Sequence, residues 1–106
     1  MSFAVEFASS AREDLLRLYE YLLDRAQTLE DLELAERALE AIETAIDVHL
    51  SRTPFIYRKA ASGNGLRREL VVPFGATGYV VLYEVVDPSK VMVLAVRHQR
   101  EEDYHY

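Results

Sequence analysis

The sequence contains no cysteine, which excludes disulfide bonds, thiolate metal sites and cysteine nucleophiles. Its apolar runs fall well short of the roughly 20 residues that a membrane-spanning helix needs. The first residues, Met1 to Phe7, form neither the basic segment nor the continuous apolar segment of a secretory signal. We therefore expect a cytoplasmic protein without a membrane anchor.

Patterns that bind nucleotides or metals are also missing. The chain has no GxGxxG, no Walker loop, no HExxH and no calcium-binding loop, so we expect neither a cofactor nor a metal ion. It also has no repeat and no linker long enough to divide it. A length of 106 residues, with 50% hydrophobic and 28% charged residues, suits one folded domain spanning 1–106.

The net charge of −6 is unevenly distributed along the chain. Of the 18 acidic residues 12 lie in the first 50 positions, together with only 4 of the 12 basic residues. An acidic surface repels phosphate backbones at long range. Strong direct nucleic-acid binding is therefore not expected, and any such contact would need the basic residues of the second half.

The first half predicts a strand followed by two helices. Phe3 to Phe7 alternates apolar and polar residues as a short strand does. Ser10-Ala-Arg-Glu13 matches a capping box, which predicts a helix that ends near Gln27. Thr28-Leu-Glu-Asp31 is a second capping signal, and the long amphipathic helix after it ends at Thr53-Pro54. The short break between the helices favours an antiparallel hairpin.

The second half predicts a loop to about Gly65 and then three strands, at 66–73, 79–86 and 91–96. The linkers between these strands are too short for parallel crossovers, so the strands form an antiparallel meander. We expect the N-terminal strand beside the last one. The predicted fold class is a two-layer α+β domain, in which an N-terminal helical hairpin packs on an antiparallel sheet of meander plus N-terminal strand.

Basic residues lie at the start and the end of this meander. Because neighbouring strand residues point to opposite faces, Arg67 and Arg68 cannot both enter one pocket. We expect Arg67 to lie near Arg97 and Arg100, at one end of the sheet. A solvated basic rim that balances nearby acids is the alternative. The His98 ring either serves recognition or packs at the end of the sheet, with Tyr79 or Tyr83 as a hydrogen-bond partner.

The arrangement of strand, helical hairpin and meander resembles toxins of the RelE/ParE superfamily from type II toxin–antitoxin modules. Three segments carry the resemblance: Gly65-Leu-Arg-Arg-Glu-Leu70, Gly78-Tyr-Val-Val-Leu-Tyr-Glu-Val85 and Val93-Leu-Ala-Val-Arg-His-Gln-Arg-Glu101. The resemblance covers nearly the whole chain. It implies a growth-inhibiting toxin, of the kind associated with plasmid stabilisation, that forms a hetero-oligomer with a ParD-like or related antitoxin.

The superfamily has two branches, and the resemblance implies different chemistry for each. RelE-like members cut mRNA on the ribosome with basic residues and a late tyrosine, for which this chain offers Arg67, Arg100 and Tyr104 or Tyr106. Two positions of that pattern are not matched, because Glu69 and Val80 stand where basic residues are expected. A carboxylate and a valine do not stabilise the charge of a phosphate in scission.

The ParE-like branch is therefore the preferred interpretation. It implies a protein that poisons DNA gyrase by binding, with no catalytic residue assigned. The alternatives are a ribosome-dependent endoribonuclease and a non-toxic member that only binds its antitoxin. Candidate residues for binding a target or partner are Arg58, Lys59, Arg67, Arg97, His98, Arg100 and Tyr104.

Overall fold

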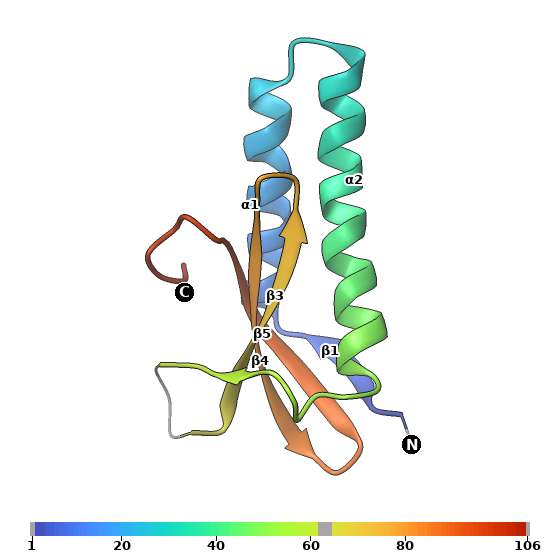
Figure 1. The fold of residues 1–106 in the computed structure, drawn as a ribbon, viewed down its shortest axis with the longest axis vertical. Helices are drawn as coiled ribbons and strands as arrows, with labels where there is room; N and C mark the ends of the chain where they lie inside the picture. The colour runs from blue at the N-terminus through green and yellow to red at the C-terminus, as the bar shows by residue number, and fades with distance from the viewer. Residues whose placement is uncertain (1, 62–64, 106) are drawn as a thin grey trace.

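The computed structural model describes residues 2–61 and 65–105 and contains two long helices and five strands (Figure 1). Residues 62–64 of the predicted loop, Met1 and Tyr106 lie outside the described part. In chain order the elements are β1 (Ala4–Phe7), α1 (Ser9–Arg25), α2 (Leu29–Ala45), the π-helical turn η1 (Ile46–Leu50), β2 (Arg58–Lys59), β3 (Arg67–Phe74), β4 (Thr77–Asp87) and β5 (Lys90–His98).

The strands form one sheet in the order β1-β5-β4-β3-β2. The meander of β3, β4 and β5 is antiparallel, and β1 lies beside β5, both as predicted. The α+β class is confirmed. Two details differ from the prediction: β1 runs parallel to β5, so the sheet is mixed, and the short strand β2 pairs with β3 inside the predicted loop.

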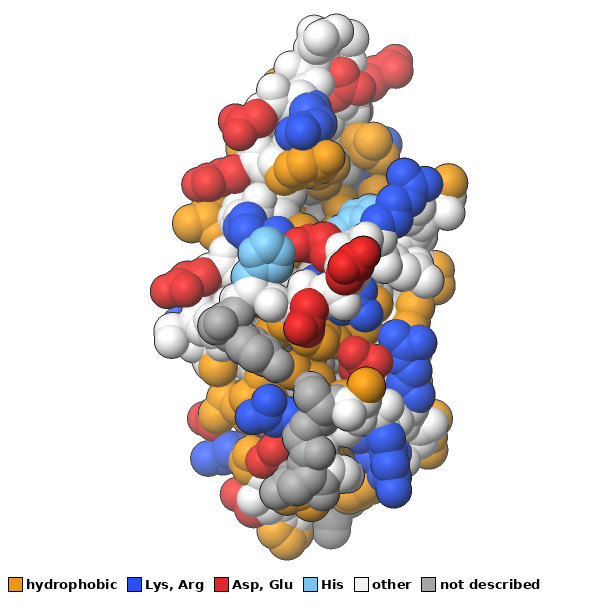
Figure 2. All heavy atoms as spheres, turned by 90° about the vertical axis from the view of Figure 1, so that its left-hand side faces the viewer, with side chains coloured by type: hydrophobic (Ala, Val, Ile, Leu, Met, Phe, Trp, Pro, Cys, Tyr) orange, Lys and Arg blue, Asp and Glu red, His pale blue; other side chains and the backbone are white. Residues whose placement is uncertain are grey.

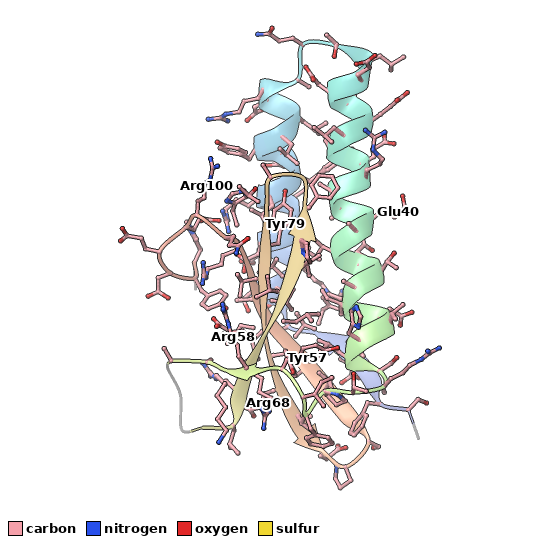
Figure 3. The ribbon with its side chains drawn as sticks, viewed as in Figure 1. Glu40, Tyr57, Arg58, Arg68, Tyr79 and Arg100 are labelled. Atoms are coloured by element: carbon pink, nitrogen blue, oxygen red, sulfur yellow. The ribbon has the colours of Figure 1, made fainter. Side chains whose placement is uncertain are left out.

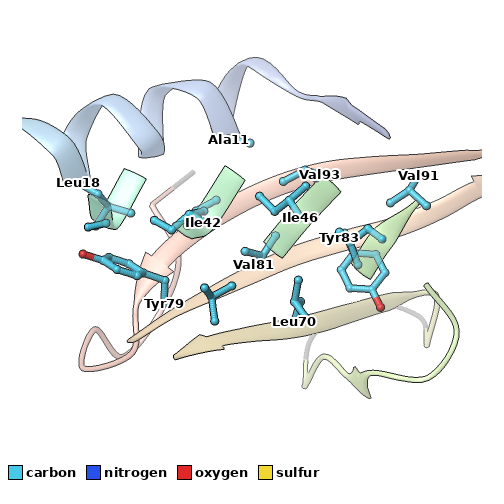
Figure 4. Close-up of a cluster of buried hydrophobic side chains, with 14 residues drawn as sticks. Ala11, Leu18, Ile42, Ile46, Leu70, Tyr79, Val81, Tyr83, Val91 and Val93 are labelled. Atoms are coloured by element: carbon cyan, nitrogen blue, oxygen red, sulfur yellow. The ribbon is translucent and has the colours of Figure 1, made fainter. Parts of the chain in front are cut away.

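The two helices pack on one face of the sheet and form the core with it. Figure 4 shows Ile42 and Ile46, of α2 and its η1 extension, in one cluster with Val81 and Val93 of the sheet. Between the helices lie small residues, among them Ala35 and Ala38, each only 1% exposed, which allows close packing of the hairpin. Burial of these side chains is the main favourable contribution to folding.

The opposite face of the sheet, called here the outer face, is covered by none of the helices in the described ranges (Figure 1). Side chains alternate along a strand, so Leu70 and Val72 of β3 point into the core while Arg67 and Glu69 point to the outer face. The expectation that Arg67 and Arg68 point apart is consistent with this arrangement. Arg68 lies on the core side and donates a hydrogen bond to the Tyr57 carbonyl at 2.8 Å.

Side chains of α1 take the place of a neighbouring strand along part of β5. The β1 pairing ends at Val93. Beyond it, the Ser10 hydroxyl donates to the Leu94 carbonyl at 2.5 Å, and the Val96 amide donates to the Asp14 carboxylate at 2.8 Å. Asp14 is only 2% exposed. This buried carboxylate therefore satisfies a backbone donor that has no strand partner on that side.

One helix cap follows the prediction and the other does not. The Thr28 hydroxyl accepts a hydrogen bond from the Asp31 amide, as the second capping signal predicts. The capping box at Ser10 is wrong, because α1 begins at Ser9 with Ala8 as its N-cap and no side chain caps it. Ser10 instead uses its hydroxyl in the tertiary contact with Leu94.

The turn between β3 and β4 depends on two glycines. Gly75 has a φ of +60°, a left-handed conformation that glycine adopts without strain. At Gly78, an added Cβ would lie 2.3 Å from the Val72 carbonyl oxygen. A side chain at position 75 would therefore strain the turn, and one at position 78 would push the start of β4 away from β3.

None of the described helices is long and apolar enough to cross a membrane.

Replacing Asp14 with alanine should destabilise the fold by about 3 kcal/mol, because the Val96 amide loses its buried acceptor and Arg17 loses one of its two carboxylate partners. Urea unfolding followed by circular dichroism measures the change. Glu13→Ala is the matched control, since Glu13 is an exposed neighbour on the same helix, and it should shift stability by less than about 0.5 kcal/mol. Equal stability of both variants would show that the Asp14 contact contributes nothing.

Candidate functional site

The candidate binding residues fall into three separate places: the outer face of the sheet, a cleft on its helix side, and the end of the sheet at which β3 begins. Figure 3 shows this division, with Arg58 low on the molecule and Arg100 on the loop after β5. The segment Gln99 to His105, called here the C-terminal tail, reaches the first two places.

Glu69 lies at the centre of the outer-face cluster. One carboxylate oxygen is 2.9 Å from Nε of Arg58 on β2, and the other accepts a hydrogen bond from the Tyr104 hydroxyl at 2.5 Å. In the sequence pattern Glu69 only interrupts a basic series. In the structure it connects the short edge strand, the sheet and the tail.

Arg97 holds the tail against the same face. Its Nη1 donates to the carbonyl oxygen of Glu101 at 2.6 Å and, more weakly, to those of His98 and Gln99. Its guanidinium carbon lies 5.1 Å from the centre of the Tyr104 ring, within the range of a cation–π contact. The Arg97 guanidinium is thus engaged in contacts within the chain.

The Tyr104 phenol stays neutral in this environment. Burial raises the pKa of Tyr104, and the hydrogen bond to the Glu69 carboxylate raises it further. The hydroxyl therefore remains a donor to Glu69 at neutral pH and is poorly suited to give up its proton.

His98 and Arg100 lie on the other side of the sheet, at a cleft of about 570 Å³ between α1, the β3–β4 turn and the start of the tail. The walls of the cleft are largely apolar and include Leu18, Leu22, Phe74 and Tyr79. The Arg100 side chain is exposed at its rim. Among the described residues it forms no ion pair.

Both ring nitrogens of His98 are occupied. Nδ1 accepts a hydrogen bond from the Arg100 amide at 3.0 Å, so in the neutral ring the proton lies on Nε2, which is 3.1 Å from the Thr77 hydroxyl. The ring also packs edge-on against Tyr79 at 5.5 Å. The predicted packing is confirmed, but the hydrogen-bond partner is Thr77, and Tyr83 donates instead to the Pro54 carbonyl.

Glu101 connects the tail to α1. Its carboxylate accepts the His98 amide at 2.9 Å, lies 3.3 Å from Nη1 of Arg17 and contacts His105. Burial alone would raise the pKa of Glu101, but these hydrogen bonds and the charge of Arg17 outweigh burial and hold that pKa below its ordinary value. The carboxylate is therefore ionised at neutral pH and fixes the tail.

The prediction that Arg67 lies near Arg97 and Arg100 is wrong. Arg67 is paired with Glu84 across the ladder, with Nε 3.8 Å from the carboxylate. Arg97 is level with Val71, which is four residues along β3, about 13 Å away. Two reversals return a third strand to the direction of the first, so the start of one and the end of the other lie at opposite ends. Lys59 is exposed on edge strand β2.

This arrangement is suited to binding and poorly suited to phosphate chemistry. Acidic and basic side chains are interspersed over the face that Figure 2 shows. Arg67, Arg100 and Tyr104, which the resemblance to RelE-like members singles out, are divided between the two faces and two ends of the sheet. In the described ranges no group of three or more histidine and acidic side chains could hold a metal ion.

Comparison with known proteins agrees with this fold. Residues 5–103 match the family model described as the ParE toxin of the type II toxin–antitoxin system parDE. A curated relative, Toxin RelE3 of Caulobacter vibrioides, is 36% identical over 101 residues, which cover 92% of this chain and 96% of the relative. The solved structure of a chromosomal ParDE system from P. aeruginosa superposes with a TM-score of 0.68 at 16% identity, covering 91% of this chain and 95% of the other.

Replacing Tyr104 with phenylalanine should loosen the tail, because the ring remains while its hydrogen bond to Glu69 is lost. We expect the amide hydrogens of the tail to exchange about tenfold faster, which corresponds to about 1.4 kcal/mol. Hydrogen exchange followed by NMR measures this. Tyr21→Phe is the control, since Tyr21 is 53% exposed and its hydroxyl makes no hydrogen bond within the described ranges. Unchanged exchange in Tyr104→Phe would contradict the assigned contact.

Acid should release the tail through Glu101. Because the folded pKa of Glu101 lies below its ordinary value of 4.5, its contribution is complete above that value and is lost as the pH falls through the folded pKa. Tail resonances followed by NMR should therefore stay unchanged down to pH 4.5 and shift only at lower pH. Glu101→Gln should already have a loose tail at neutral pH, and the exposed Glu102→Gln should titrate as the parent does. A tail that titrates identically in Glu101→Gln would contradict the assignment.

Proposed function

This chain belongs to the ParE toxin family of type II toxin–antitoxin systems, and on that premise we propose that it inhibits DNA gyrase by binding and is neutralised by a cognate antitoxin. The proposal rests on one observation: the arginines of the outer face are engaged in contacts within the chain. Arg58 is paired with Glu69, and Arg97 holds the tail. These two arginines support a shaped binding surface, and their contacts within the chain make them poorly available to a phosphate.

Ribosome-dependent mRNA cleavage finds less support. Scission through the 2′-hydroxyl needs a proton acceptor, cations for the developing charge and a proton donor for the leaving oxygen within one site. His98 has hydrogen-bond partners at both ring nitrogens, and the Tyr104 phenol is bound to a carboxylate. Arg67 and Arg100 lie too far apart to share one phosphate.

The target would contact the second half of the chain, and the antitoxin would occupy grooves along the helical hairpin. The cleft beside His98 and Arg100 offers apolar walls for an amphipathic helix. The free edge of β3 beyond β2 presents the backbone of Val71 to an extended segment, while Pro73 limits pairing there. Both partners and the toxin would meet in the cytoplasm.

Purified gyrase with the toxin added distinguishes the candidate functions. We expect inhibition of supercoiling and accumulation of gyrase-linked DNA breaks, with mRNA intact in cells that express the toxin. Addition of the protein encoded by the neighbouring gene should restore supercoiling. Boiled toxin is the control for contaminants.

Two other outcomes would contradict gyrase inhibition. Cut transcripts within translated frames, abolished by Arg100→Ala and without DNA damage, would identify an endoribonuclease. Growth without either effect, in the presence of a stable complex with the neighbouring gene product, would identify a member that binds its antitoxin and is not toxic.

A further inference from the structure

The cleft on the helix side of the sheet contains a tyrosine hydroxyl that no contact of the fold occupies. The Tyr79 ring lies between two other rings, with Phe74 at 6.4 Å and His98 at 5.5 Å. Tyr79 is only 5% exposed, and within the described ranges its hydroxyl forms no hydrogen bond. Tyr83 points to the same face of the sheet, and its hydroxyl does have a partner, the Pro54 carbonyl.

The unpartnered hydroxyl of Tyr79 is directed to the cleft. Figure 4 shows it pointing out of the core cluster on the side of Leu18, and both residues line the cleft. Folded proteins seldom leave a polar group in such a position without a hydrogen-bond partner. Burial raises the pKa of Tyr79, so the hydroxyl keeps its proton and can donate. The inside of the cleft therefore offers a donor to an occupant.

The size and the walls of the cleft are those of a small-molecule site. Its volume of about 570 Å³ lies within the range of roughly 300 to 1,000 Å³ that is usual for such sites. Apolar side chains come from three elements, with Leu18 and Leu22 on α1, Leu34 on α2 and Phe74 at the end of β3. Sites of this kind combine apolar walls with a few polar groups that orient the ligand.

The charge available at the mouth of the cleft is positive. Two arginines line the cleft, and Arg17 is balanced by Asp14 at 3.5 Å and by Glu101 at 3.3 Å. Arg100 is exposed and forms no ion pair among the described residues. An anionic group is therefore attracted to the rim, and a cationic group is repelled.

These features limit the occupant. A purely apolar molecule would leave the Tyr79 hydroxyl without an acceptor and Arg100 without a counterion. A nucleotide carries several negative charges, for which one unpaired arginine is too little. A single carboxylate matches the fork of one guanidinium, and an aromatic body suits the rings of Tyr79, Phe74 and His98.

We propose that this cleft binds a small aromatic carboxylate, with its carboxylate at Arg100, its ring system against Leu18 and Phe74, and an oxygen acceptor at the Tyr79 hydroxyl. The site goes beyond the proposed function and does not depend on it. Because the cleft is formed by α1, the β3–β4 turn and the start of the tail, the ligand connects three segments. It should therefore also raise the melting temperature of the protein.

Titration of the purified protein with methoxynaphthoate, an aromatic carboxylate with a ring oxygen, tests the proposal. We expect saturable binding with a Kd below about 1 mM, followed by the amide resonances in NMR. The shifts should centre on the lining of the cleft, including Leu22, Gly75 and Thr77. The corresponding primary amide has the same ring system without the charge and should bind about tenfold more weakly.

Three variants assign the polar contacts. Arg100→Ala should raise the Kd of methoxynaphthoate about tenfold, and it should fold as the parent does because Arg100 is exposed. Tyr79→Phe keeps the ring and removes only the hydroxyl, and it should raise the Kd about fivefold. Arg12→Ala is the control, since Arg12 is an exposed cation on α1 outside the cleft, and its Kd should change by less than about twofold.

The contrary results are distinct from a failure of the proposed function. Equal binding of the carboxylate and the amide, or equal binding to the parent and Arg100→Ala, would overturn the carboxylate site and leave an apolar surface of the kind that protein segments cover. Absence of saturation at millimolar concentrations, or shifts centred on other elements, would overturn the site altogether. A protein that inhibits gyrase and fails to bind methoxynaphthoate would refute the ligand site alone.

Discussion

The bond between the Asp14 carboxylate and the Val96 amide connects the two layers of the molecule at the point where regular sheet pairing stops. β1 covers the edge of β5 only as far as Val93, and α1 covers the rest of that edge as far as Val96. A buried carboxylate is costly unless it is fully hydrogen-bonded, so this contact fixes the helix at one height along the strand. Arg17, near Asp14 on the same helix, then extends the same connection to Glu101 and the tail.

Both faces of the sheet depend on that placement. The tail leaves β5 at a position set by α1, and from there it delivers Tyr104 to Glu69 on the outer face and Arg100 to the cleft on the helix side. A protein of this size thus presents surfaces of different chemistry on different sides. The outer face is mixed in charge, the cleft is apolar with a basic rim, and a groove along α2 is acidic. Such a distribution suits a protein that binds a target and a neutralising partner with different surfaces.

Patterns local in the sequence predict much of this fold. The apolar residues of α2 recur at helical spacing, which identifies the helix and its buried side. The linkers between β3, β4 and β5 are short, which requires antiparallel pairing. Both features depend on residues that are near each other in the chain. Ser10 shows the limit of such reasoning. Its spacing to Glu13 matches a cap, but a carbonyl 84 residues away accepts the hydroxyl's hydrogen bond.

The candidate site is less predictable for the same reason. The residues that organise it, Glu69, Glu101 and Arg17, act through partners on other elements, and no spacing in the sequence identifies these pairs. A late tyrosine can be selected from the sequence, but the contact of Tyr104 depends on the carboxylate that it meets. The position of Arg67 follows from strand direction. Because β3 and β5 run in the same direction, the start of β3 and the end of β5 lie at opposite ends of the sheet.

The parallel pairing of β1 with β5 brings residues 4–7 against residues 90–93. During synthesis β1 cannot pair until β5 has been made. The nascent chain can form its two helices and the β3–β4 hairpin before that point, but not the whole sheet. The outer face and the cleft, which depend on the closed sheet, can therefore form only after β5 has been synthesised.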